Sequence, residues 1–198
     1  MIEAAAALEL IKNRLSPHRY QHSLNVAVVA RDLAQRHRVD SEKAYLAGVL
    51  HDYAKNLSEQ ELLAIAENNP GIADEMEKQI PEVLHAPVGA FLLQQELGIA
   101  DEEILQAVKF HTLGSTKMTP LDKVIFMADM IEPGRAEYPQ LERLRTAARE
   151  DLDEAMLLGL ESTILYCLEQ QRLLHPRTVE ARNYFLPQPG KYLTREMI

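Results

Sequence analysis

The stretch from residue 44 to residue 56 reads AYLAGVLHDYAKN, an apolar segment that ends in a histidine, an aspartate and a lysine. Residues 40–42, Asp-Ser-Glu, precede it and are typical of a helix start, so we expect a helix from residue 41 to about residue 55. On such a helix His51 shares the inward face with the alanines one and two turns before it. Asp52 follows directly. A carboxylate after such an apolar segment does not match the pattern of a solvated helix face. The segment therefore predicts a helical core that carries polar side chains.

Helix signals recur along the chain, and strand signals are scarce. There is no Trp, there are 4 Phe, and no segment alternates between apolar and polar residues over a useful length. Capping residues, prolines and glycines mark further helix boundaries. The expected starts are Ser16-Pro17, Ser58-Glu59, Pro87, Asp101-Glu102, Thr119-Pro120 and Leu141, and the last pattern runs over residues 141–174 with a weak point near Asp151. We expect an all-α single domain of eight or more helices over residues 1–186, followed by an extended or loose tail over residues 187–198.

Composition limits the class of protein. The 198 residues suit one domain, and 46% hydrophobic with 26% charged residues is typical of a globular chain. A net charge of −9 disfavours a protein that grips nucleic acid over its whole surface. The single cysteine, Cys167, fits a reducing compartment, and no segment resembles a signal peptide or a membrane span. We therefore expect a cytoplasmic protein with no membrane partner.

Four further polar groups fall on apolar faces or beside them. His22 shares a helical face with apolar residues at positions 26, 29 and 33, and His111 follows an apolar helix face. Asp129 lies inside the apolar segment VIFMADMI, and His85 stands in a short connection before Pro87. Each residue alone would more often be a satisfied core residue than a ligand. Together with His51 and Asp52 they are best explained by a shared metal ion, because unpartnered burial of such a set would cost several kcal/mol.

The type of metal follows from the donors. Imidazole and carboxylate suit Fe, Mn, Zn or Mg, and the lack of a thiolate argues against a structural zinc site. The other three histidines have ordinary interpretations: His18 in a first helical turn, His37 at a helix C-terminus and His175 in a loop. Cys167 is expected at a core-like position and not as a nucleophile.

Five blocks of sequence, in order, resemble those of a known family. They are HSLNVAVVARDLA from His22, LAGVLHDYAKN from Leu46, HAPVGAFLLQQELGI from His85, VKFHTLGSTKMTPLDKVIFMADMIEPGR from Val108 and HPRTVEARNYF from His175. Their order and content resemble the YqeK-type family of HD-domain phosphohydrolases. The resemblance extends over almost all of the chain from residue 17 to residue 183.

This resemblance implies an iron-dependent enzyme that hydrolyses dinucleoside tetraphosphates symmetrically, so that diadenosine tetraphosphate yields two ADP. It implies primary metal ligands at His22, His51, Asp52 and Asp129. His85 and His111 would either bind a second metal, with Asp52 as the bridge, or contact a phosphate. Mn or another divalent metal is the alternative to Fe, and the sequence leaves open whether one or two ions bind.

Positive and polar groups near these ligands are candidates for contacting phosphates. Lys55 lies three residues after Asp52, and Arg135 follows the Pro133-Gly134 break after Asp129. We expect Asp52, Lys55 and Arg135 to be catalytic. Arg19, one turn before His22, is a weaker candidate. The expected substrate-binding residues are His22, Lys55, His85, His111, Thr112, Asp129, Arg135, Thr178 and Arg182, with Thr178 capping a helix that begins after Pro176.

Other functions remain open from the sequence alone. The chain could act on a nucleoside triphosphate, a nucleoside monophosphate or a cyclic nucleotide, or it could bind nucleotides at a metal site without turnover. RNA binding is disfavoured because the net charge is negative and no basic patch interleaves with aromatic residues. The expected partner is a small nucleotide, and a homodimer is one option for the assembly.

Overall fold

The computed structural model describes residues 2–138 and 140–186, so the expected tail lies outside the described residues. This part of the chain forms ten α-helices and two short 3₁₀ helices, with no strand among the residues described. The helices are α1 (Ala4–Arg14), α2 (Pro17–Arg36), α3 (Ser41–Leu50), α4 (Glu59–Asn68), η1 (Glu77–Gln79), η2 (Pro81–Val83), α5 (His85–Leu97), α6 (Glu102–Phe110), α7 (Pro120–Ile131), α8 (Leu141–Glu150), α9 (Leu152–Glu169) and α10 (Pro176–Phe185). The all-α single domain is confirmed.

Local capping explains most helix starts. The Ser16 hydroxyl accepts a hydrogen bond from a first-turn amide of α2, and the Asp40 and Asp101 carboxylates do the same for α3 and α6. Ser58 and Thr119 form full capping boxes at α4 and α7. Each such cap stabilises a helix by about 1 kcal/mol, and each uses residues adjacent in sequence. These boundaries were therefore predictable from sequence.

Two helix boundaries differ in detail from the expectation, and a third agrees with it. α3 ends at Leu50 instead of near residue 55, and the chain continues in tight turns with a Tyr53 N–H to Leu50 C=O bond of 3.0 Å. The His51 ring bonds to the Gly48 carbonyl at 2.8 Å. In a continuing α-helix this carbonyl would accept a hydrogen bond from the amide four residues later. α5 begins at His85, so Pro87 is its third residue and His85 is not in a connection. The predicted weak point at Asp151 divides α8 from α9, and its carboxylate caps α9.

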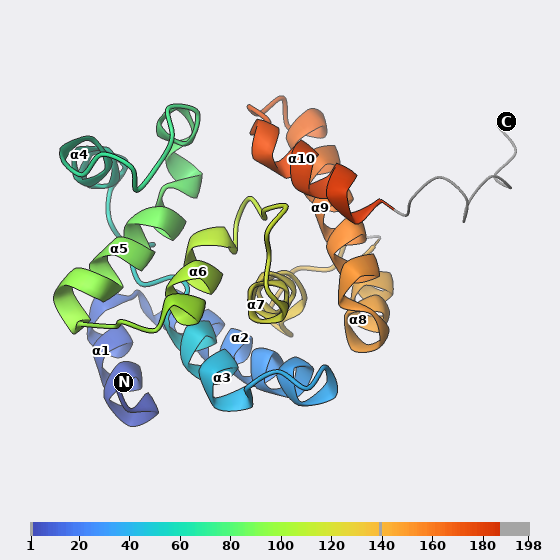
Figure 1. Ribbon diagram of the computed structural model, residues 1–198, viewed down its shortest axis with the longest axis horizontal. Coiled ribbons are helices and arrows are strands. Elements are labelled where there is room, and N and C mark those ends of the chain that lie inside the picture. The colour runs from blue at the N-terminus through green and yellow to red at the C-terminus, as the bar shows by residue number, and fades with distance from the viewer. Residues whose placement is uncertain (1, 139, 187–198) are drawn as a thin grey trace, which may run out of the picture.

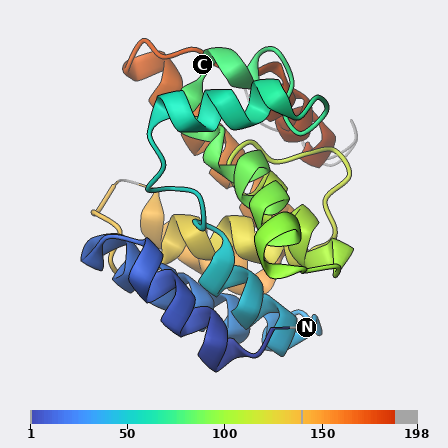
Figure 2. The ribbon, with the colours of Figure 1, turned by 90° about the vertical axis from the view of Figure 1, so that its left-hand side faces the viewer.

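Close packing brings the central helices together. α2 packs against α3 and α7, and α6 packs against α3, α5 and α7. Gly48 permits the contact between α2 and α3, because a Cβ there would lie 2.7 Å from the Ala27 Cα atom. Figure 1 shows α1 to α3 on one side of α7 and α8 to α10 on the other, and Figure 2 shows α5 rising above the blue N-terminal helices. The core is therefore built around five helices that pack on one another: α2, α3, α5, α6 and α7.

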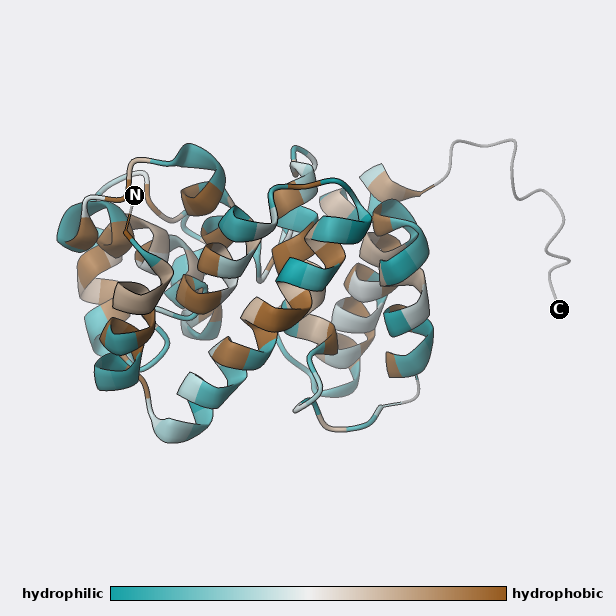
Figure 3. Cartoon of the chain, turned by 90° about the horizontal axis from the view of Figure 1, so that it is seen from below, coloured by the Kyte–Doolittle hydropathy of each residue, from teal (hydrophilic) through white to brown (hydrophobic). Residues whose placement is uncertain are grey.

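The helices have mixed faces. Figure 3 shows hydrophobic and hydrophilic residues alternating along most of them, as expected for helices with one buried side. Among the described residues, no helix combines the length and the apolar composition that a membrane crossing would need. The large fully buried side chains include Phe126, Ile125 and Met127 of α7, which makes α7 the central helix of the core.

Candidate metal centre

Six side chains from five parts of the fold meet in the core. His22 comes from α2, His85 from the first residue of α5, and Asp129 from α7. His51 and Asp52 occupy the turn after α3, and His111 follows the last residue of α6. All are at most 6% exposed except Asp129, whose side chain is 18% exposed. We call this set the His/Asp cluster: His22, His51, Asp52, His85, His111 and Asp129.

Every histidine of the cluster has its Nδ1 atom held by an acceptor. His51 Nδ1 donates to the Gly48 carbonyl at 2.8 Å, His85 Nδ1 to the Glu82 carbonyl at 2.8 Å, and His111 Nδ1 to the Val108 carbonyl at 2.6 Å. His22 Nδ1 instead faces a carboxylate oxygen of Glu132 at 3.1 Å. The proton is thereby placed on Nδ1, and the lone pair of each Nε2 points into the cluster.

Asp52 lies between two halves of the cluster. Its Oδ2 atom is 3.7 Å from His22 Nε2 and 3.6 Å from His51 Nε2. Its Oδ1 atom is 3.3 Å from His85 Nε2 and 3.8 Å from His111 Nε2. Asp129 completes the first half, with Oδ1 3.0 Å from His22 Nε2. One carboxylate therefore presents one oxygen to each pair of histidines.

The nitrogen positions fit a divalent cation. His22 Nε2 and His51 Nε2 are 3.3 Å apart, and His85 Nε2 and His111 Nε2 are 3.1 Å apart. Because the protons are on Nδ1, each pair brings two lone pairs together in a buried place, where neither nitrogen can donate to the other. A cation beside each pair would satisfy its two lone pairs at once. Imidazole nitrogens and carboxylate oxygens are ligands suited to first-row divalent metals.

The pKa values of most of these groups also favour cation binding. Burial lowers the pKa of His51, and burial together with the His85 ring lowers the pKa of His111 to about 3. Burial alone would raise the pKa of Asp52, but the histidines around it hold that pKa well below its usual value. Both histidines are therefore neutral and Asp52 is ionised at neutral pH, which is the state a metal ligand requires.

In the pair of His22 and Asp129 the pKa of the histidine is raised, unlike the pKa values of His51 and His111. Burial lowers the pKa of His22, yet its hydrogen bond to Asp129 and the nearby carboxylates bring that pKa above the usual value. Burial would raise the pKa of Asp129, but His22 and Arg135 keep it low. A proton on His22 would thus offset the charge of the carboxylates, and a metal ion would take over that role.

Three cations border the cluster. Arg135 Nε donates to the Asp129 carbonyl at 2.7 Å, and its Nη2 pairs with the Asp129 carboxylate. Lys55 Nζ lies 3.4 Å from His85 Nε2, and burial lowers the pKa of this lysine. Arg19 Nη1 donates to Asp52 Oδ2 at 3.3 Å. The structure therefore brings Lys55 and Arg135 to the cluster, as expected, and gives Arg19 an equally direct contact.

Sequence reasoning missed Glu132. It is 3% exposed, and besides facing His22 it accepts hydrogen bonds from Asn25 Nδ2 at 2.8 Å and from the Gly134 amide at 2.6 Å. A carboxylate behind a ligand histidine fixes the tautomer and the orientation of the ring. The available signals were an acidic residue just before Pro133-Gly134, at the end of the apolar helix that carries Asp129, and an asparagine one turn after His22.

Other predicted residues lie away from the cluster. The prediction that Thr178 caps α10 is wrong: His175 is the N-cap, because its Nδ1 accepts from the Arg177 amide, and Thr178 donates to the Leu113 carbonyl at 3.2 Å. Arg182 pairs with Glu161 of α9 at 2.6 Å. Thr112 and Thr178 both line a hollow of about 520 Å³, which we call the Thr112 hollow.

The remaining residues with ordinary predicted roles show mixed outcomes. His18 lies in the first turn of α2 and His37 is its C-cap residue, as expected, and the His37 ring also contacts the Ala148 carbonyl at 2.8 Å. His175 is not a simple loop residue, since it caps α10 and contacts Asp74 at 3.1 Å. Cys167 is half-buried and not part of the core.

Comparison with known proteins agrees with this site. Residues 19–134 match the HD domain, a span that holds the whole His/Asp cluster. A protein of Halalkalibacterium halodurans named symmetrical bis(5'-nucleosyl)-tetraphosphatase is 41% identical over 185 residues, which covers 91% of this chain and 95% of the relative. A protein of Bacillus subtilis with the same name is 38% identical over 180 residues, with 91% and 96% covered.

A crystal structure from Clostridium acetobutylicum has the same fold. It is described as a predicted HD superfamily hydrolase involved in NAD metabolism, with 38% sequence identity and a TM-score of 0.88 over 93% of this chain and 97% of that one. The ordered blocks of sequence, the helical fold, the clustered histidines and aspartates and these relatives all agree. The chain belongs to the HD domain family, and to the YqeK-type group within it.

Proposed function

We propose that the protein is a divalent-metal-dependent phosphohydrolase that cuts diadenosine tetraphosphate and related dinucleoside tetraphosphates symmetrically, giving two nucleoside diphosphates. The observation that carries this proposal is the position of Asp52, with one oxygen toward each pair of buried histidines. The names of the two curated relatives supply the substrate class and the position of the cut.

The ligands divide as the distances suggest. His22, His51, Asp52 and Asp129 would hold one divalent ion, and His85 and His111 would hold a second that shares Asp52. Such an ion would supply Lewis-acid activation of water and of a phosphoryl oxygen. We propose iron as the metal, following the family resemblance, with manganese as the alternative. Glu132 keeps His22 oriented for this task through its contact with Nδ1.

The cations around the cluster would receive the phosphates. Arg135 stands next to Asp129, the most exposed member of the cluster, and its own side chain is 36% exposed. Its planar guanidinium suits the paired oxygens of a phosphate. Lys55 and Arg19 add positive charge beside His85 and Asp52. These groups would stabilise the negative charge that gathers on a polyphosphate as its central bond breaks, and a nucleoside diphosphate is a good leaving group that needs little acid assistance.

The Thr112 hollow would hold one half of the substrate. Its lining includes Thr112, the residue after His111, together with Tyr166 and Thr178. Apolar surface with a few polar groups is typical of a nucleoside site, and the volume of about 520 Å³ lies within the usual range for small-molecule pockets. Arg182 pairs with Glu161 and does not line this hollow, so its expected contact with the substrate stays a prediction from the sequence. A cytoplasmic location and a homodimer stay predictions from the sequence.

Product analysis tests this function. The purified protein, loaded anaerobically with Fe(II) or with Mn(II), is given diadenosine tetraphosphate, and the products are separated by chromatography. We expect ADP alone, and loss of activity after chelation that either metal reverses. AMP and ATP in equal amounts would refute the symmetrical cut. Preferred turnover of a nucleoside triphosphate, a cyclic nucleotide or NAD in the same assay would refute the substrate class, and binding without turnover would leave only a nucleotide-binding protein.

A further inference from the structure

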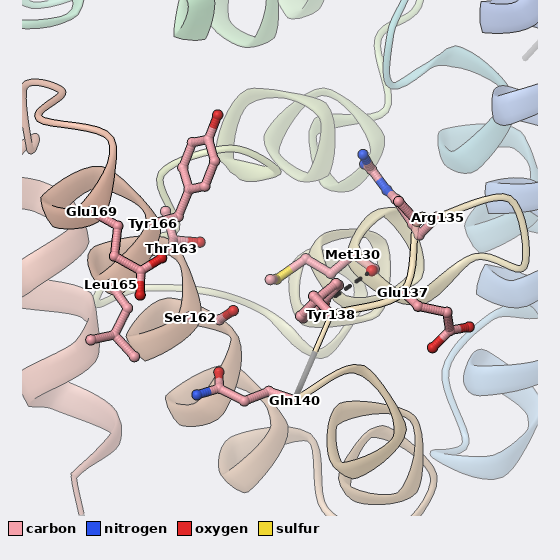
Figure 4. A pocket seen from close by; sticks show the side chains of 11 residues that line it. Met130, Arg135, Glu137, Tyr138, Gln140, Ser162, Thr163, Leu165, Tyr166 and Glu169 are labelled. Atoms are coloured by element: carbon pink, nitrogen blue, oxygen red, sulfur yellow. Dashed lines mark hydrogen bonds between the residues drawn. The ribbon is translucent and has the colours of Figure 1, made fainter.

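A second hollow, of about 680 Å³, is lined in part by Arg135, the residue that pairs with Asp129 of the cluster. We call it the Tyr138 hollow. One wall is formed by residues 130, 135–138 and 140, and the opposite wall is the C-terminal part of α9. Figure 4 shows Ser162, Thr163 and Tyr166 on the α9 side, facing Met130 and Tyr138, with Arg135 at the edge. The hollow therefore combines aromatic and apolar surface with several hydroxyl and amide groups.

Arg135 connects this hollow to the cluster. The same side chain lines the hollow and pairs with the Asp129 carboxylate. Asp129 is also the member of the cluster that is most open to solvent. A polyphosphate that leaves the cluster past Asp129 thus meets a guanidinium first and the Tyr138 hollow next.

The two hollows approach the cluster through different residues. Thr112, which lines the first hollow, follows His111 of the half that holds His85, whereas Arg135, which lines the Tyr138 hollow, pairs with Asp129 of the half that holds His22. Thr163 and Tyr166 of α9 line both hollows and so form the wall that they share. Asp52 lies between these two halves of the cluster.

We propose that the Tyr138 hollow binds the second nucleoside of a dinucleoside polyphosphate, while the Thr112 hollow binds the first. This inference rests on the proposed function. Tyr138 and Tyr166 offer faces on which a base can stack, and Gln140 and Ser162 offer polar groups to the base or the ribose. Arg135 contacts the diphosphate between this nucleoside and the cluster.

Two nucleoside sites explain a symmetrical cut. A substrate held at both ends has two arms of equal length, which centre the bond between the two inner phosphates on Asp52 and its histidines. Water adds to one of the two inner phosphorus atoms, and the bond from that phosphorus to the central bridging oxygen breaks. The bridging oxygen leaves with the other nucleoside diphosphate, and the water gives up one proton to the solvent. A substrate held at one end alone would lack this centring.

The test fills the Tyr138 hollow without touching the cluster. Ser162 lines this hollow and not the Thr112 hollow, so Ser162→Phe places a ring in one site only. Ser162→Ala is the matched control, because it removes the hydroxyl and leaves the space open. The two substrates are diadenosine tetraphosphate, which needs both hollows, and adenosine 5'-tetraphosphate, whose one nucleoside can use the Thr112 hollow.

We expect Ser162→Phe to lower kcat/KM for diadenosine tetraphosphate about tenfold or more, as loss of a base–aromatic stack would. Hydrolysis of adenosine 5'-tetraphosphate should be unchanged, and Ser162→Ala should behave as wild type with both substrates. Calorimetric titration of the metal-loaded protein with ADP should give two ADP per chain for wild type and one for Ser162→Phe.

Equal losses with both substrates, or no loss with either, would overturn the inference. So would one ADP per chain in the wild-type protein, a measurement that needs no variant and decides the matter even if Ser162→Phe fails to fold. The proposed function has a separate readout, because wild-type protein that makes ADP alone from diadenosine tetraphosphate sustains it whatever the variants do.

Discussion

Glu132 offers a sharp perturbation of the cluster, because it contacts a metal-ligand candidate without entering the site. Glu132→Gln keeps the size of the side chain but replaces one acceptor oxygen with an NH₂ group. The carboxylate now accepts from His22 Nδ1, from Asn25 Nδ2 and from the Gly134 amide. All three groups are donors, so an NH₂ group must face at least one of them. The variant therefore loses a charged hydrogen bond in a place that is 3% exposed.

The loss of one hydrogen bond sets the size of the expected effect on stability and on metal affinity. A lost hydrogen bond to a buried charged group lowers the free energy of unfolding by about 1–3 kcal/mol. If the freed donor is His22 Nδ1, the ring is no longer held with Nε2 toward Asp129, and metal affinity should fall about 10- to 100-fold. Turnover at limiting metal should fall with it, and excess metal should restore part of it.

The assay is competition for Mn(II) with a chromophoric chelator, together with thermal unfolding of the metal-free protein. Glu137→Gln is the matched control, since it makes the same chemical change in the same segment, where the side chain is 77% exposed. Metal affinity equal to wild type in a folded Glu132→Gln variant would refute the role assigned to Glu132.

Two further predictions concern stability. Gly48→Ala should lower the free energy of unfolding by about 1–3 kcal/mol, because the added Cβ would lie 2.7 Å from the Ala27 backbone. Gly89→Ala is the control and should be tolerated, because the nearest neighbours of its added Cβ lie at 3.7 Å. Denaturant midpoints of both variants check this. Burial would raise the pKa of Asp74, but the Glu77 amide, His175 and Arg177 keep it below its usual value, so its contribution to stability is present above pH about 4 and is lost as the pH falls through the lower folded-state pKa. Asp74→Asn should therefore be less stable than wild type at neutral pH and should lose less stability on acidification, and a denaturant midpoint that falls with acid as steeply as in wild type would refute this.

Local signals explain what the sequence could predict. Ser58 with Glu61, and Thr119 with Asp122, are pairs within one turn, so the starts of α4 and α7 were legible without tertiary structure. The cluster residues could be predicted for a related reason. A polar residue on an apolar helical face is buried when the helix packs, and a buried polar group needs a partner. His22, His111 and Asp129 are residues of this kind.

Contacts between distant segments explain what the sequence could not predict. Asn25 and Glu132 are 107 positions apart, and nothing local to either pairs them. α3 ends at Leu50 because the chain turns inward and the His51 ring takes a backbone carbonyl, although the apolar pattern continues beyond that point. Thr178 resembled a helix cap by residue type, but His175 filled that position and left the Thr178 hydroxyl to bond Leu113.

The central claim is that the His/Asp cluster is a metal centre, and Asp52→Asn tests it most directly. The amide keeps the shape of the side chain but lacks the negative charge that would hold cations between the two halves. Metal content, melting temperature and ADP formation are measured on one preparation. The account predicts that metal and turnover are both lost while the fold survives, because the amide fills the same space and a chain of this length buries a core that does not depend on one side chain. A folded Asp52→Asn protein with full metal content and normal turnover would contradict it.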